Sequence, residues 1–176
     1  MEFLTLTDFS GTEHPAIWSS QPEPAEPLLR AMEEAEYAAI AWENPDGFPT
    51  LQALSGLGSR LLTTEYWQEA FPEAGLLISS SISGGDLEQR FRELSARRRC
   101  WLQLQPMAAV FPLPCPDGQG KPMDGLPESE GFYSKALLCR YLHSPGQVIL
   151  FDTAETLEQK TLLAKECGFE GVISYP

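Results

Sequence analysis

The strongest constraint on the fold lies near the C-terminus, where a strand, a helix and a second strand follow one another. Residues 147–151 and 171–175 are apolar runs of strand length. Between them, Asp152 is a good helix cap with Glu155 three residues later, and Gly168 is a good C-terminal stop. A strand–helix–strand unit with this spacing predicts two parallel strands in one sheet.

The rest of the sequence continues this alternation of strands and helices. Residues 2–8 alternate apolar and polar side chains, and strand-length apolar runs recur at 37–42, 75–82 and 100–105. We therefore expect one α/β domain over residues 1–176, with a mostly parallel sheet and flanking helices. A full eightfold barrel needs about 250 residues, so a closed form would be a cut-down or degenerate (β/α) barrel.

Composition excludes some partners. The net charge is −13, from 12 Lys and Arg against 25 Asp and Glu. Such a surface repels phosphate backbones and anionic lipids, so we expect neither nucleic acid nor a membrane as a partner. The basic cluster at residues 90–99 is either an anion patch or a solvated helix end, and the second interpretation is favoured.

Cysteine and histidine usage predicts no metal and no cofactor. No two cysteines have Cys-x-x-Cys spacing, and only His14 and His143 are available as imidazole ligands. No run of about 18 apolar residues occurs, and residues 1–7 lack the features of a signal peptide. We expect a cytoplasmic protein with reduced thiols at the four cysteines, which are Cys100, Cys115, Cys139 and Cys167.

Ligands of parallel sheets bind at the carboxyl ends of the strands, and several polar side chains are expected there. The candidates for ligand binding are Trp42, Ser83, Gln105 and Tyr175. Ser83 precedes two glycines and a predicted helix, a pattern that suits either an anion-binding turn or a simple glycine turn.

Glu43 and Asp152 are the only two carboxylates that this reasoning assigns to one rim. Two facing carboxylates can perform acid–base chemistry on a glycosidic bond. The alternative is structural: Glu43 simply ends a strand, and Asp152 caps a helix.

Residues 112–131 contain five prolines and predict a long loop, which in a compact domain is a binding element or a mobile segment. An exposed apolar patch around residues 111–116 would instead support a structural or assembly module.

The stretch 136–175 resembles the last part of family 18 glycoside hydrolases, the chitinase-like class that includes spore-germination glycosidases. The residues that carry the resemblance are Arg140-Tyr141, then residues 148–152, 155–160 and 164–168, and Gly171-Val172. The resemblance implies a barrel closed by a Gly-Val strand, and an aromatic floor for a sugar at Tyr175, where the family usually has Trp.

The family's Asp-x-x-Asp-x-Asp-x-Glu strand is absent, and residues 100–105 contain no carboxylate. The resemblance therefore implies a non-hydrolytic relative. We expect a ligand-binding or interaction protein, with carbohydrate, another small molecule or a protein as partner. A small enzyme using Glu43 and Asp152, or a structural module, remains an alternative.

Overall fold

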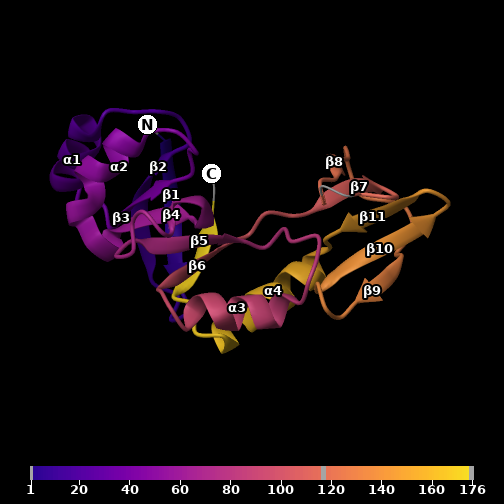
Figure 1. Ribbon diagram of the computed structural model, residues 1–176. Coiled ribbons are helices and arrows are strands. Elements are labelled where there is room, and N and C mark those ends of the chain that lie inside the picture. The colour runs from indigo at the N-terminus through magenta and orange to yellow at the C-terminus, as the bar shows by residue number, and fades with distance from the viewer. Residues whose placement is uncertain (1, 116–117, 175–176) are drawn as a thin grey trace.

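The computed structural model describes residues 2–115 and 118–174 and shows a closed barrel joined to a separate antiparallel sheet (Figure 1). Seven strands form the barrel, in the order β1-β12-β6-β5-β4-β3-β2, and five form the appended sheet, in the order β8-β7-β11-β10-β9. The barrel strands are β1 (Glu2–Asp8), β2 (Glu13–Ser19), β3 (Ala39–Trp42), β4 (Leu61–Thr64), β5 (Gly75–Ser79), β6 (Cys100–Gln103) and β12 (Gly171–Ser174).

The helices are short and mostly flank the barrel. The α-helices are α1 (Ala25–Glu34), α2 (Phe48–Leu54), α3 (Leu87–Ser95) and α4 (Ala154–Glu166), and the 3-10 helices are η1 (Ser55–Arg60) and η2 (Glu65–Trp67). The appended sheet contains β7 (Ala108–Pro112), β8 (Lys121–Pro122), β9 (Phe132–Ser134), β10 (Cys139–Ser144) and β11 (Gln147–Phe151).

The expected mostly parallel α/β sheet is wrong, and so is the (β/α)-barrel form of it. The structure consists mostly of β-strands. Its barrel is a mixed sheet, and the second sheet is wholly antiparallel. Strand β1 pairs antiparallel with both β2 and β12, whereas the other barrel neighbours are parallel. Only residues 9–12 join β1 to β2, which is too short for the helical crossover that parallel strands need.

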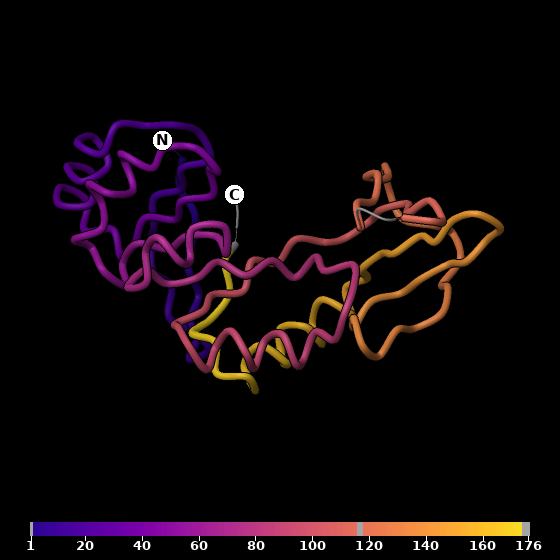
Figure 2. The backbone as a smooth tube through the Cα atoms, in the orientation of Figure 1, coloured from indigo at the N-terminus to yellow at the C-terminus, as the bar shows by residue number. Residues whose placement is uncertain are grey.

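The strand–helix–strand unit at the C-terminus is present, but its two strands do not pair. Strand β11 belongs to the appended sheet, between β7 and β10, whereas β12 lies in the barrel between β1 and β6. Figure 2 shows the chain leaving the barrel after β6, building the appended sheet away from it and returning through α4. Helix α4 therefore bridges two sheets instead of crossing over one.

Alternating side chains divide the core into an inner and several outer clusters. The barrel interior is filled by small and branched residues together with Trp101. On the outside, one cluster packs under α1 and α2 and another under α3 and α4. The inner residues are Leu4, Leu6, Ala16, Ala39, Ala41, Leu62, Leu77, Trp101 and Ile173.

Candidate functional site

A carboxylate and an amide meet across the carboxyl end of the barrel. Glu43 follows β3 and Gln103 ends β6, and the Gln103 Nε2 donates to Glu43 Oε1 at 2.9 Å. Strands β4 and β5 lie between β3 and β6 in the barrel wall, so this bond crosses the lumen. Gln103 is buried and Glu43 is half-buried. The barrel, apolar over most of its interior, thus ends in a polar layer.

Two further polar residues extend this layer along β5 and β6. The hydroxyl of Ser79 donates to Gln105 Oε1 at 3.1 Å. Ser79 lies opposite Gln103 in the parallel β5–β6 register, so the two side chains share the inner face. The backbone N–H of Gln105 donates to the Ser80 hydroxyl at 3.0 Å, which fixes the segment that leaves β6. We define Glu43, Ser79, Gln103 and Gln105 as the rim cluster.

Trp18 is the aromatic residue that the structure brings to this interior. It lies on β2, is half-buried and packs against the inner cluster of the barrel. The sequence analysis did not select it as a site residue. The signal that could have identified Trp18 is its position two residues after Ala16 on β2, because residues two apart on a strand point to the same face.

Trp42 lies on the other side of the barrel wall from the rim cluster. Its indole is fully buried in the cluster under α1 and α2, and its Nε1 donates to the carbonyl of Asn44 at 2.9 Å. Trp67 donates to the same carbonyl at 2.9 Å. Trp42 is therefore closed to a stacking ligand.

Of the remaining predicted residues, Ser83 lies in the exposed turn before α3, where its hydroxyl donates to the Gly118 carbonyl at 3.4 Å. Tyr175, the expected sugar floor, lies outside the described residues.

Asp152 is a buried structural residue and not part of a cleft. Its carboxylate accepts two bonds from Lys160 Nζ, at 2.7 and 2.8 Å, one from the Met107 N–H at 2.9 Å and one from the Thr156 hydroxyl at 3.0 Å. Both charged side chains are inaccessible to solvent. With its oxygens so occupied, Asp152 has no access to a substrate.

Lys160 completes this arrangement and was missed by the sequence analysis. Its ammonium also donates to the carbonyl of Ser80, the residue after β5, at 2.9 Å. The buried pair thus ties the barrel, α4 and the start of the appended sheet together; we call Asp152 and Lys160 the latch. The available signal was spacing, because Thr156, Lys160 and Ala164 recur every fourth residue and form the buried stripe of α4.

The N-cap of α4 is Thr153, one residue later than expected. Its hydroxyl accepts from the Thr156 N–H at 3.3 Å, and the Thr156 hydroxyl accepts from the Thr153 N–H at 2.8 Å, as in a capping box.

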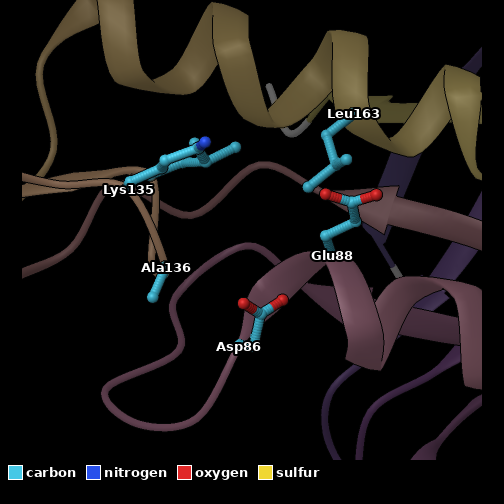
Figure 3. A pocket seen from close by; sticks show the side chains of 6 residues that line it. Asp86, Glu88, Lys135, Ala136 and Leu163 are labelled. Atoms are coloured by element: carbon cyan, nitrogen blue, oxygen red, sulfur yellow. The ribbon is translucent and has the colours of Figure 1, made fainter.

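A cavity of about 490 Å³ lies where α3, α4 and the turn after β9 meet (Figure 3). Asp86 and Glu88 approach it from α3, Lys135 from the turn and Leu163 from α4. Asp86 already caps α3 by accepting a backbone N–H at 2.9 Å, and Glu88 pairs with Arg92 at 2.8 Å. The acidic groups therefore have structural roles, and the charges around the cavity balance without a ligand.

The described residues contain no group of three or more His, Cys, Asp and Glu side chains that could hold a metal ion. Over the same residues, no helix has the length and apolar character needed to cross a bilayer. No protein-family model, curated protein or solved structure matches this chain.

Proposed function

We propose that this chain is a non-hydrolytic binding protein whose ligand site is the rim cluster at the carboxyl end of the barrel. The observation that carries the proposal is the hydrogen bond between Glu43 and Gln103 across the lumen. A carboxylate and an amide paired at the end of an apolar barrel offer both an acceptor and donors to a polar ligand.

A hydroxyl-rich ligand suits this chemistry best. Ser79, Gln103 and Gln105 can each donate and accept, as sugar hydroxyls do. Trp18 supplies an aromatic side chain in the same interior. The resemblance of residues 136–175 to family 18 glycoside hydrolases supports carbohydrate as the ligand class.

The burial of Asp152 argues against the alternative of an enzyme that uses Glu43 and Asp152. Glycoside hydrolysis needs two carboxyl groups facing one cleft, about 5–10 Å apart. Glu43 faces the lumen, whereas Asp152 is fully enclosed in the latch. An acid–base pair would require the latch to open, which would leave Lys160 buried without its counter-ion.

Thermal unfolding in the presence of chitin and peptidoglycan oligosaccharides and simple sugars tests the proposal. A ligand present at 100 times its Kd adds about 2.7 kcal/mol to stability, which is a readable shift in Tm. We expect Glu43→Gln to abolish the shift while keeping the unliganded Tm close to wild type. The matched control is Asp46→Asn, because Asp46 is an exposed acid three residues away. The absence of any sugar-dependent shift, or its equal loss in Asp46→Asn, would refute the proposal.

A second candidate, an assembly module, is favoured by apolar side chains on the appended sheet and its loop. Leu126 and Phe132 are 57% and 65% exposed, and Leu113 is 46% exposed. Phe111, in contrast, is buried, so the exposed surface only partly matches the expected patch at 111–116. Sedimentation velocity would detect self-association. Phe132→Ser should remove it, whereas Tyr66→Ser, which changes an exposed aromatic residue near the barrel, should not.

We also propose a cytoplasmic location. The four cysteines are free thiols, which supports a reducing compartment.

A further inference from the structure

The end of the barrel opposite the rim cluster has a second, smaller cavity. It measures about 170 Å³ and lies where β2, β3, β4 and β6 begin. Leu6, Ala39, Leu62 and Trp101, all residues of the barrel interior, form its apolar wall. This volume is below the range of about 300–1,000 Å³ that is typical of drug-sized ligands, so only a small group fits.

One wall of this cavity carries a guanidinium whose charge is not neutralised by an acid. Arg60 donates from Nε to the Ala38 carbonyl at 3.1 Å and from Nη2 to the Tyr37 carbonyl at 2.8 Å. These carbonyls hold the side chain in place but carry no formal charge. Within residues 2–115 and 118–174, no carboxylate forms an ion pair with Arg60. Arg60 differs in this from Arg99, the other arginine that lines the cavity, which pairs with an acid.

A second arginine approaches the same cavity with one end already fixed. Arg99 forms a two-pronged ion pair with Glu170, with both bonds at 3.0 Å. Its remaining nitrogen, Nη1, lies 3.3 Å from the Ser59 hydroxyl. Ser59 is next to Arg60 in the chain, and Ser59, Arg60 and Arg99 line the same cavity.

Three other arginines of the basic stretch have partners away from this cavity. Arg90 pairs with Glu65, Arg92 pairs with Glu88, and Arg98 donates to the backbone carbonyls of Gln68 and Phe71. Of the arginines considered for an anion patch at residues 90–99, only Arg99 lines this cavity.

From this geometry we infer that the amino-terminal end of the barrel binds a phosphate group, as inorganic phosphate or as the end of a small phosphomonoester. The planar fork of arginine matches the oxygens of phosphate, and Arg60 keeps three of its five N–H groups available. The Ser59 hydroxyl adds a neutral donor. His14 also lines the cavity, and its Nε2 lies 3.3 Å from the Asp8 carboxylate.

The test is titration of the full chain with inorganic phosphate in a phosphate-free buffer, followed by isothermal calorimetry and ³¹P NMR. We expect saturable binding to one site that Arg60→Gln weakens at least tenfold. Arg97→Gln is the matched control, because Arg97 is an exposed arginine that does not line this cavity; its affinity should stay within twofold of wild type. No saturable binding by the wild type, or an equal loss in Arg97→Gln, would overturn the inference.

A second variant and two further ligands complete the test. If Arg60→Gln does not fold, as judged by circular dichroism, Ser59→Ala should still weaken phosphate binding about threefold, and an unchanged affinity would overturn the inference. Methyl phosphate and acetate distinguish ligand classes. Tight binding of methyl phosphate supports an esterified ligand, and its exclusion supports free phosphate. Acetate bound as tightly as phosphate would overturn the assignment to a phosphate group.

Discussion

Burial divides the four thiols of this protein into two kinds. Cys100, Cys139 and Cys167 are buried, whereas Cys115 is only partly so. Burial raises the pKa of the Cys100 thiol to about 12 and that of Cys139 to about 11, since the thiolate loses hydration. Because the thiolate is the reactive form, Cys115 is the accessible nucleophile among them.

We therefore predict that native protein at pH 8 reacts with a thiol reagent such as iodoacetamide in one fast phase. Cys115 should react about tenfold or more faster than the buried thiols. Mass spectrometry of partly alkylated protein would locate the label, and Cys115→Ser should remove the fast phase. In denaturant all four thiols should react alike. Early labelling of Cys100 or Cys139 would contradict this view of the core.

Asp8 organises the turn between β1 and β2. Its carboxylate accepts bonds from the Ser10 hydroxyl at 2.6 Å and from the backbone N–H groups of Ser10 and Thr12, both at 2.9 Å. These bonds, that of Ser10 foremost, hold the pKa of Asp8 well below its usual value. Its contribution to stability is thus present above the unfolded-state pKa and is lost as the pH falls toward the lower folded-state pKa.

The expected outcome for Asp8→Ala is a loss of stability that is largest at pH 5–8 and shrinks below about pH 4. Urea unfolding of wild type and variant between pH 7 and pH 3 would measure the difference. An exposed acid such as Asp46, changed to Ala, should show no such trend. If the difference in unfolding free energy between wild type and Asp8→Ala grew as the pH fell, the turn would not depend on the ionised carboxylate.

At the scale of elements, the latch decides how α4 joins the two sheets. Lys160 lies on α4, Asp152 directly follows β11, and the ammonium also reaches the carbonyl of Ser80, directly after β5. A helix stripe of Thr156, Lys160 and Ala164 would be too polar for an ordinary core, and the buried ion pair is what allows it to be enclosed.

Lys160→Met should destabilise the protein by about 3–5 kcal/mol, because it leaves the Asp152 carboxylate buried and without its counter-ion. Adding Asp152→Asn should recover part of that loss, because removing both buried charges destabilises the fold less than removing only one of them. Lys165→Met on the same helix is the control; Lys165 is exposed and makes one weak contact with the Phe9 ring, worth about 1 kcal/mol or less. Urea denaturation curves would measure the stability of all three variants. A small effect of Lys160→Met would show that the latch does not stabilise the fold.

At the scale of the whole molecule, closure of the barrel depends on a close approach of β12 to β1. Gly171 starts β12 and pairs with Asp8 at the end of β1. A Cβ at this position would overlap the Thr7 carbonyl oxygen and would lie 2.6 Å from the Asp8 Cα and 2.8 Å from the Trp101 ring. Only glycine lets the first and last strands of the barrel meet here.

Gly171→Ala should consequently cost at least about 1–3 kcal/mol, the usual penalty for overpacking, because backbone atoms and not a flexible side chain must move. Gly84→Ala is the matched control, since nothing lies within 4 Å of a Cβ at that exposed position. Thermal unfolding would rank the two variants. Equal Tm values would show that the barrel tolerates a wider gap between β1 and β12.

Local signals predicted many of the elements. Strand β1 spans the expected residues 2–8. Helix α3 begins after Asp86, whose carboxylate accepts a bond from the Gln89 N–H. The hairpin of β10 and β11 turns at Pro145 and Gly146. Each of these depends on neighbours in the chain: alternation of side chains, a cap or a turn residue.

The candidate site could be predicted only in part. Glu43 and Gln105 were identified from their positions after strands, and the structure brings both to the carboxyl end of the barrel. Trp42 was misplaced, because residues 39–42 are apolar on both faces and their sequence does not tell inside from outside. Gln103 was missed for the same reason, since it ends a strand that is otherwise apolar.

The sequence by itself determined the positions of several strands, helix caps and turns, and it set the acidic charge of the surface. Only the tertiary structure decided that β11 and β12 lie in different sheets, that β1 closes the barrel antiparallel, and that Asp152 pairs with Lys160 instead of facing a ligand. The physical reason is distance along the chain. Periodicity and caps arise between near neighbours, whereas the partner of a strand or of a buried charge is chosen by contacts between residues far apart in sequence.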